Sequence, residues 1–320
     1  MASASTELEF VTVDVFTEER YEGNPLAVVL IPPATTLTQA QKLSVAREFN
    51  LSETTFLHES DDEDAKTWTV DIFMTTGELP FAGHPMIGTA CHVLGRAAKA
   101  KGVTSGTIEA GFDIKAGKIK LRYDVEKGVT RAGIPHNVHI HRRTYAREEL
   151  LKLQPRLAEA SRAGKFSVKQ DFPVVSIVKG MTFVLVELES EEALSLVGTT
   201  GTSFSMGGLD EEWNETFVGM YFFVRCKDAP NGTKVLRTRM IEGTVEDPAT
   251  GSAASDLAAY LSLVEGKPAE SLRYEIVQGV EMGRRSKIEI EVVLTEKDAV
   301  ISNIFLSGTS TKVMTGRLTI

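Results

Sequence analysis

Two segments of the chain are predicted to be helices buried on all sides, and each follows a glycine. Residues 85–94 and 252–261 are rich in Ala and Leu, and apolar side chains occur around most of the helical circumference. A helix that is apolar all round must be surrounded by other elements. The two glycines, Gly83 and Gly251, lie 168 residues apart (251 minus 83). The chain therefore has to fold around two buried helices, which leaves few possible architectures.

The surroundings of the two helices are also similar. Two further pairs share the offset of 168, namely Gly111 with Gly279 and Phe49 with Phe217. Segments in which apolar and polar residues alternate, as in half-buried strands, flank the helices. Their apolar positions are Trp68, Val70, Ile72 and Met74, then Ile119, Leu121 and Tyr123, and finally Ile288, Ile290, Val292 and Leu294. Strands outnumber helices without a regular βαβ order, so we expect an α+β fold of two similar halves, not a doubly wound parallel sheet.

Turn residues place the boundary between the halves at residues 125–145, where Lys127-Gly128 and Gly133-Ile-Pro135 occur. We expect an N-terminal half at residues 1–127 that also takes a C-terminal strand at about 305–320. The C-terminal half then covers residues 128–304, and the active site lies in the cleft between the halves. A capping box, with Thr38 as N-cap and Gln41 three residues later, predicts a further helix that ends near Asn50.

Charge and cysteine content exclude several classes of protein. The chain has 320 residues with a formal net charge of −9, and clusters of basic residues are only pairs, such as Arg142-Arg143. We therefore expect no nucleic-acid partner. No apolar run is long enough to span a bilayer, and residues 1–10 do not resemble a secretory signal. Two distant cysteines, Cys91 and Cys226, exclude a disulfide framework. We expect a cytoplasmic protein with no membrane partner.

The sequence contains none of the common cofactor-binding or catalytic motifs. The chain has no GxGxxG after a strand, no GxxxxGK[ST], no GxSxG and no HExxH. We therefore expect no cofactor. His136, His139 and His141 lie close together, and the last two would share one face of a strand, an arrangement that suits a metal ion. No carboxylate lies near them in the sequence, so we predict no metal site.

Ser52-Glu53 is the first of three candidate parts of an active site. It joins the capped helix to the apolar run at residues 54–57. A carboxylate in such a place is partly desolvated, which raises its pKa and makes it a general acid or base near neutral pH. The alternative is an ordinary surface glutamate.

The other two candidates open the two buried helices. At Gly83-His84-Pro85 the unpaired amides of a helix N-terminus would attract an anion, and His84 adds a titratable side chain. At the second helix Ser252 takes the place of His84, and Asp247 lies shortly before Gly251. Two such N-termini, facing each other, would bind a small carboxylic acid. The alternatives are a structural turn at His84 and ordinary helix caps at the second site.

The ordered series of motifs resembles the PhzF-like isomerase family of phenazine biosynthesis. The resemblance runs from about residue 8 to the C-terminus. The motifs that carry it are Asp14-Val-Phe-Thr17, Gly23-Asn-Pro-Leu-Ala-Val-Val29, Ala46-Arg-Glu-Phe-Asn-Leu-Ser-Glu53, Glu78-Leu-Pro-Phe-Ala-Gly-His-Pro85, Glu246-Asp-Pro-Ala-Thr-Gly-Ser-Ala253, Gln278-Gly279 and Met282-Gly-Arg284.

The resemblance implies a fold like diaminopimelate epimerase, with two pseudo-symmetric domains that each wrap a barrel-like sheet around a central helix. It also implies a cofactor-independent homodimer that isomerises a dihydro-hydroxyanthranilic acid by moving a proton between ring carbons. The acid/base glutamate of the family matches Glu53. Its substrate-binding residues match Gly83, His84, Asp247, Gly251 and Ser252. We assign catalysis to Glu53, Asp247 and His84, and substrate binding to Ser52, Gly83, Gly251 and Ser252.

Related epimerases and proline racemases use two cysteines, one just before each of these glycines. This chain has Ala82 and Thr250 there, so a two-thiol mechanism is excluded and a one-base proton shuttle by Glu53 follows. We predict an isomerase that acts on a small cyclic or amino carboxylic acid. The alternatives are an epimerase or racemase of an amino-acid-like substrate, and a non-catalytic binding or scaffold protein with the same fold.

Overall fold

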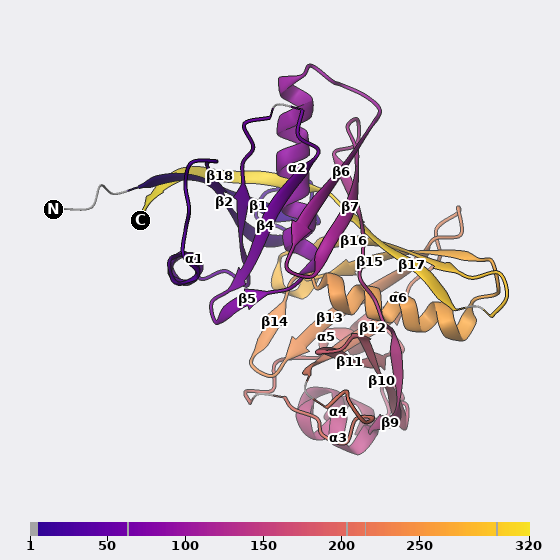
Figure 1. Ribbon diagram of the computed structural model, residues 1–320. Coiled ribbons are helices and arrows are strands. Elements are labelled where there is room, and N and C mark those ends of the chain that lie inside the picture. The colour runs from indigo at the N-terminus through magenta and orange to yellow at the C-terminus, as the bar shows by residue number, and fades with distance from the viewer. Residues whose placement is uncertain (1–5, 63, 203, 215, 299) are drawn as a thin grey trace. The chain divides into compact units, whose positions relative to one another are not determined.

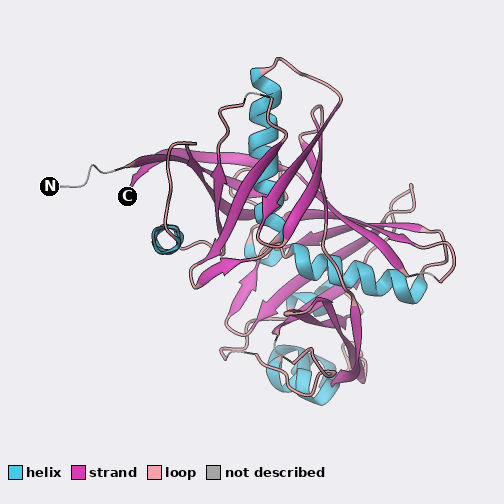
Figure 2. Ribbon diagram, in the orientation of Figure 1, coloured by secondary structure: helices cyan, strands magenta, loops and turns pink. Residues whose placement is uncertain are grey.

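The computed structural model describes residues 6–62, 64–202, 204–214, 216–298 and 300–320. Residues 1–5, which are part of the segment examined for a secretory signal, lie outside the described residues. The chain divides into two compact units. Unit 1 comprises Met1–Gly133 and Ser307–Ile320, and unit 2 comprises Ile134–Leu306. Figure 1 labels the elements of both units, and Figure 2 shows that strands dominate each of them, which confirms the α+β class.

Unit 1 is a curved sheet around one long helix. Its strands are β1 (Glu7–Val15), β2 (Asn24–Ile31), β3 (Thr54–His58), β4 (Thr67–Met74), β5 (Gly77–Leu79), β6 (Thr107–Ile114), β7 (Gly117–Asp124), β8 (Val129–Gly133) and β18 (Ser310–Thr319). The order in the sheet is β18-β1-β2-β3-β4-β6-β7-β8, with β5 paired to β4. Helix α2 (Gly83–Ala100) packs against β1, β2, β3, β7, β8 and β18. Twelve of its residues are buried, which explains why it is apolar on nearly every side.

A second helix covers the outer face of this sheet. Helix α1 (Gln39–Phe49) begins at Thr38, whose side chain accepts from the Gln41 amide, and the backbone turns left-handed at Asn50. The predicted capping box and helix end are therefore confirmed. The helix packs on β3 and β4 and buries Phe73, whose ring meets that of Phe56 edge to face at 5.4 Å. This second buried face explains why Phe73 is buried. Met74, which the alternation assigned to the core, is the last residue of β4 and is only half-buried.

Unit 2 has the same plan. Its strands are β9 (His139–Ala146), β10 (Asp171–Val178), β11 (Met181–Glu187), β12 (Phe217–Arg225), β13 (Lys234–Glu242), β14 (Val245–Asp247), β15 (Ser271–Gln278), β16 (Ser286–Leu294) and β17 (Ile301–Gly308), the last of which crosses into unit 1 at its end. Its helices are α3 (Arg147–Leu153), α4 (Pro155–Arg162), α5 (Glu191–Ser195), α6 (Gly251–Glu265) and the 3-10 turn η1 (Val280–Met282). The sheet order is β9-β10-β11-β12-β13-β15-β16, and α6 packs against β10, β11, β15 and β16.

The strand directions repeat from one unit to the other. Pairs β1–β2 and β10–β11 are antiparallel, β2–β3 and β11–β12 parallel, and β3–β4 and β12–β13 antiparallel. Pairs β4–β6 and β13–β15 are parallel, and β6–β7 and β15–β16 antiparallel. In each unit a short strand precedes the central helix and pairs antiparallel with the strand before it. These pairs are β4–β5 in unit 1 and β13–β14 in unit 2. Two pseudo-symmetric units, each a sheet around a helix, are thereby confirmed.

Only one of the three residue pairs at offset 168 marks equivalent positions. Gly83 and Gly251 are the first residues of α2 and α6. Gly111 lies inside β6, whereas Gly279 follows β15, so this pair is a coincidence. The fold shows why, because the offset changes along the chain.

The strand registers give the true offsets. Trp68 pairs with Phe112 in unit 1, and the equivalent Leu236 pairs with Ile276 in unit 2. The shift is 168 before the helix (236 minus 68) but 164 after it (276 minus 112). From the start of the central helix to the next strand, unit 2 is therefore four residues shorter, and three of these four are lost from the helix, which has 15 residues in α6 and 18 in α2. The Phe49 and Phe217 pair is also wrong, since the first ends α1 and the second begins β12.

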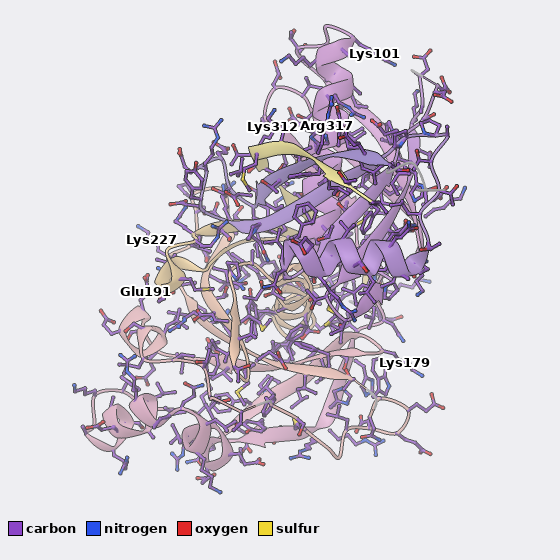
Figure 3. The ribbon with its side chains drawn as sticks, turned by 90° about the vertical axis from the view of Figure 1, so that its left-hand side faces the viewer. Lys101, Lys179, Glu191, Lys227, Lys312 and Arg317 are labelled. Atoms are coloured by element: carbon purple, nitrogen blue, oxygen red, sulfur yellow. The ribbon has the colours of Figure 1, made fainter. Side chains whose placement is uncertain are left out.

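Charged side chains cover the exterior, and many are paired locally (Figure 3). Lys101 contacts Asp64 at 2.7 Å, and Lys179 contacts Glu212 at 3.0 Å. Such exposed pairs contribute little stability, but the carboxylate of each pair offsets the positive charge of its lysine. No helix in the described part of the chain has the length and hydropathy of a membrane span.

Candidate active site

The N-terminus of α2 lacks the side-chain cap that α1 has. Its N-cap residue, Ala82, is extended (φ −151°, ψ 140°) and has no side chain that can accept a hydrogen bond. Pro85, the third helical residue, has no N–H group. The first turn therefore presents the amides of Gly83 and His84 at the positive end of an 18-residue helix. This is the arrangement that favours binding of a carboxylate.

Glu53 and His84 come together at this helix end. Glu53 lies between α1 and β3, and His84 is the second residue of α2. His84 Nε2 lies 3.5 Å from Glu53 Oε2, and the two side chains are only 6% and 15% exposed. Ser52, which precedes Glu53, is exposed. Unit 1 thus brings an acid/base candidate and a histidine to the start of one helix, as the sequence suggested.

The imidazole of His84 is neutral, and its tautomer is set by Asn24. Burial lowers the pKa of His84 to about 3, because loss of hydration disfavours the charged ring. Asn24 Nδ2 lies 3.4 Å from His84 Nδ1, and an amide nitrogen can only donate. His84 Nδ1 therefore accepts, so the single ring proton sits on Nε2, on the side that faces Glu53.

A hydrogen-bond network holds the loop before α6. Thr250 Oγ1 donates to Asp247 Oδ2 at 2.5 Å, and Gln278 Nε2 donates to the Asp247 carbonyl at 2.8 Å. Gln278 Nε2 also donates to Thr250 Oγ1 at 3.0 Å, while its Oε1 accepts from the Tyr221 hydroxyl at 2.9 Å. The carboxylate of Asp247 therefore has a fixed position at the end of β14.

A glycine after β15 packs closely against the loop before α6. Gly279 has a φ of +78°, and a Cβ there would lie 2.4 Å from the Arg284 carbonyl oxygen and 2.7 Å from that of Pro248. Backbone atoms cannot move aside easily, so only glycine fits. The close approach places Gln278, the preceding residue, against the start of α6.

The N-terminus of α6 also has no side-chain cap. Thr250 is its N-cap residue, but the hydroxyl donates to Asp247 and does not accept from the helix. Gly251 is buried and Ser252 half-buried in the first turn. Unit 2 therefore carries its three predicted site residues, Asp247, Gly251 and Ser252, at one helix end.

The two thiols lie away from the positions that a two-cysteine racemase would need. Cys91 is buried in the third turn of α2, where burial raises the pKa of its thiol. Cys226 follows β12 and is half-buried. Ala82 and Thr250 stand directly before the two helix-opening glycines. Neither residue can act as a thiol base.

Sequence reasoning missed three residues that shape these two sites: Asn24, Thr250 and Gln278. All three belong to the motifs that carry the family resemblance, so their positions could have been noticed. Their spacing in the sequence, however, indicates no role for them in the site. Their partners lie 60, 28 and 57 residues away in the chain. Only the folded structure connects them.

Comparison with known proteins identifies relatives along the whole chain. Residues 13–316 match the family of phenazine biosynthesis-like proteins. A trans-2,3-dihydro-3-hydroxyanthranilate isomerase of Pseudomonas aeruginosa is 32% identical over 288 residues, which cover 87% of this chain and 88% of the relative. A Bacillus anthracis phenazine biosynthesis protein of the PhzF family has a similar crystal structure, with a TM-score of 0.73 at 19% identity over 98% of this chain and all of that one.

A more distant structure extends the fold comparison to epimerases. A hydroxyproline epimerase of Agrobacterium vitis superposes with a TM-score of 0.57 at 14% identity, over 99% of this chain and 93% of that one. At this identity the similarity concerns the fold alone. It confirms the expected epimerase-like architecture.

Proposed function

The chain belongs to the phenazine biosynthesis-like protein family, and we propose that it isomerises a small cyclic or amino carboxylic acid by moving one proton. Its relatives include enzymes named as isomerases, and the chain is an isomerase of this family. The proposal adds the substrate class and the mechanism. The observation that carries it is the Glu53–His84 pair at the uncapped N-terminus of α2.

In the proposed reaction Glu53 acts alone as the acid/base. Its carboxylate removes a proton from a carbon of the substrate next to a double bond. The electron pair of that C–H bond forms a new double bond to the neighbouring carbon, and the pair of the old double bond moves to the carbon at its far end. The carbon at the far end of that system then receives the proton from the Glu53 carboxylic acid. Substrate and product differ only in the position of one hydrogen and one double bond, so no oxidant or second reactant is needed.

His84 supplies a neutral donor to this step. With a pKa of about 3 the ring is neutral at neutral pH, and its one remaining proton, on Nε2, can donate a hydrogen bond. We propose that Nε2–H stabilises the negative charge that develops on the substrate. The amides at the start of α2 bind the substrate carboxylate.

We further propose that Asp247, Gly251 and Ser252 of unit 2 take part in substrate binding. Their fixed loop and uncapped helix support this assignment. Cytoplasmic location and a homodimer remain predictions, and light scattering of the purified protein tests the second.

Replacing Glu53 by Gln tests the central assignment. Because Gln keeps the shape but cannot take up a proton, turnover should fall by about 10²- to 10⁴-fold. The assay follows deuterium uptake by NMR in D₂O, with trans-2,3-dihydro-3-hydroxyanthranilate as the first compound and other cyclic and amino acids after it. Glu48→Gln is the matched control, because Glu48 is exposed on α1.

The same assay distinguishes the alternatives. Full activity in Glu53→Gln contradicts the assignment. Deuterium uptake with inversion at a single stereocentre identifies an epimerase, which needs a second acid/base group. If no acid is turned over and none raises the melting temperature, the binding-protein alternative is favoured.

A further inference from the structure

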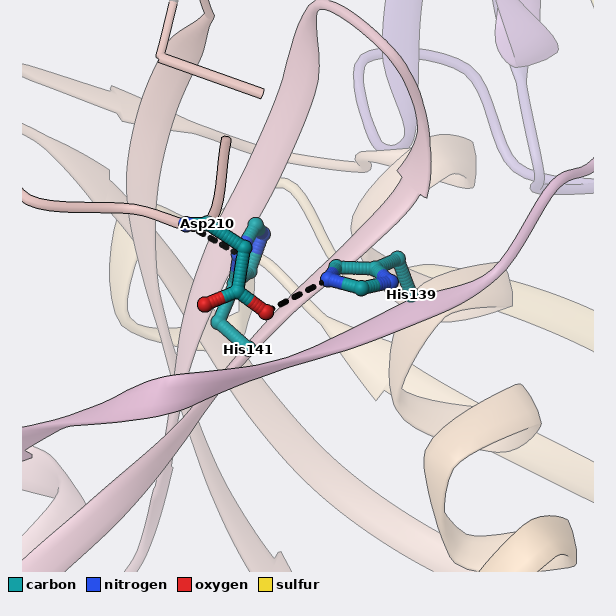
Figure 4. A group of neighbouring side chains, drawn as sticks. All are labelled: His139, His141 and Asp210. Carbon is teal, nitrogen blue, oxygen red and sulfur yellow. Dashed lines mark hydrogen bonds and ion pairs between the residues drawn. The ribbon is translucent and has the colours of Figure 1, made fainter. Parts of the chain in front are cut away.

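A second group of titratable side chains lies in unit 2. His139 and His141 stand on β9, and Asp210 comes from a loop 71 residues later in the chain (Figure 4). His139 Nε2 lies 2.8 Å from Asp210 Oδ2, and ligand atoms of all three residues lie within 4.8 Å of one another. The prediction of no metal site relied on the absence of a partner carboxylate, and this premise is wrong because the fold brings Asp210 to the two histidines. Sequence distance concealed Asp210.

A chain of hydroxyl groups fixes the tautomer of His141. The Thr216 hydroxyl donates to the Phe217 carbonyl at 3.0 Å, so it accepts from Thr182 at 2.8 Å. The Thr182 hydroxyl then accepts from Ser176 at 2.6 Å. Each hydroxyl has only one proton, so Ser176 must accept from His141 Nε2, 2.9 Å away. The lone pair of His141 is therefore on Nδ1, on the side of Asp210.

We propose that His139, His141 and Asp210 bind a divalent transition-metal ion, for which Zn²⁺ is the natural probe. Two imidazole nitrogens and one carboxylate form a common ligand set for such ions. A ligand histidine usually donates its other ring N–H to a neighbouring group, and Ser176 accepts that proton here. The site is a new one and does not depend on the proposed isomerase activity.

The surroundings allow the three ligands to close around an ion. In a tetrahedral zinc site ligand atoms lie about 3.3 Å apart, so the 4.8 Å span must contract. His141 is buried on a strand, and Trp213 stacks on the His139 ring at 4.6 Å. Asp210 Oδ2 belongs to a loop and can move. The weak contact to His141 Nδ1, from the Asp210 amide at 3.4 Å, is easily replaced.

Access and charge also suit a cation. The side chains of His139 and Asp210 are 33% and 23% exposed, which gives an ion a path from solvent. Lys179 lies over the Trp213 ring at 5.7 Å, but it is paired with Glu212. The bound ion would fasten the loop around Asp210 to β9, and water would complete its coordination.

Calorimetric titration of ZnCl₂ into the untagged, EDTA-dialysed full chain tests the proposal. We expect one ion per chain in the wild type and at least 100-fold weaker binding in His139→Ala and Asp210→Asn. His136→Ala is the matched control, because His136 is a neighbouring histidine outside the group, and it should bind as the wild type does. Cys226→Ser excludes binding by the half-buried thiol.

His141 is buried, so its substitution can disturb folding. Ser176→Ala leaves the ligands in place but removes the proton acceptor of His141, together with the hydrogen bond to Thr182, and should weaken Zn²⁺ binding by about tenfold. Zn²⁺ should also raise the melting temperature of the wild type, but not that of His139→Ala. The proposal fails if no 1:1 binding occurs, if His139→Ala and Asp210→Asn bind as well as the wild type, or if Cys226→Ser removes the binding.

Discussion

The N-termini of α2 and α6 have the same backbone setting and different side-chain chemistry. Each helix follows a short antiparallel strand, begins at a glycine and has no side-chain cap. At α2 two titratable groups, Glu53 and His84, lie 3.5 Å apart. At α6 the Thr250 hydroxyl donates to one carboxylate, that of Asp247, and the side-chain amide of Gln278 donates to the backbone carbonyl of the same residue. The repeated backbone therefore gives two helix ends without a side-chain cap, and the proposed proton transfer belongs to the one at α2.

The first prediction compares His84 with Ser252, which hold equivalent positions (252 minus 84 is again 168). His84→Leu should lower kcat by about 100-fold, because the donor to the developing charge is lost. Ser252→Ala should mainly raise KM. His84→Gln, which keeps a neutral N–H donor, should recover part of the loss. Equal losses of kcat in His84→Leu and Ser252→Ala would show that the two helix ends share the chemistry.

The pH dependence of stability gives an independent test of His84. Burial lowers its pKa to about 3, whereas the unfolded ring titrates at 6.5. As the pH falls below 6.5 the unfolded chain therefore binds a proton that the folded chain does not, and stability decreases by up to about 1.4 kcal/mol per pH unit. Urea unfolding between pH 6.5 and 4 should show a shallower decrease for His84→Leu. An unchanged slope would mean that the ring is charged in the folded protein.

The second prediction concerns Asn24 as a positioning residue. Asn24→Ala removes the donor to His84 Nδ1, so both neutral tautomers become populated and kcat should fall by about tenfold. Asn24→Asp should lower kcat further, because a carboxylate at this position accepts a hydrogen bond and therefore favours the tautomer with the proton on His84 Nδ1. NMR of the ring nitrogens reads the tautomer directly. If the proton stays on His84 Nε2 in Asn24→Ala, the side-chain amide of Asn24 does not determine the tautomer.

Asn24 also shows where sequence reasoning succeeds and where it stops. The α1 capping box and the buried central helices could be predicted because their signals lie within a few residues or one helical period. Glu53 and His84 could be selected for their local chemistry and the family resemblance. The contact between Asn24 and His84 could not be predicted, because the two residues are 60 positions apart in the chain and meet only when β2 and α2 pack together. Asp210 was missed for the same reason.

The third prediction tests the network at α6. Gln278→Leu removes one of the two buried acceptors of the Tyr221 hydroxyl, so that only Thr238 Oγ1 remains, and it removes two hydrogen bonds from the loop at Asp247 and Thr250. We expect a loss of about 2–3 kcal/mol in the free energy of unfolding, measured by urea denaturation, together with a raised KM. Gln170→Leu is a control for the substitution itself, because Gln170 is exposed. A raised KM without any loss of stability would mean that Gln278 contacts the substrate.

The smallest expected effect concerns the missing cap of α2. Ala82 already has the extended backbone of an N-cap residue, so Ala82→Ser should supply an acceptor for the first-turn amides. Stability should then rise by about 0.5–1 kcal/mol, while KM rises because the serine competes with the substrate carboxylate for the same N–H groups. Thr38→Ala makes the reverse change at α1 and should cost about 1 kcal/mol without altering KM. If Ala82→Ser stabilises the protein and leaves KM unchanged, the substrate does not bind at this helix end.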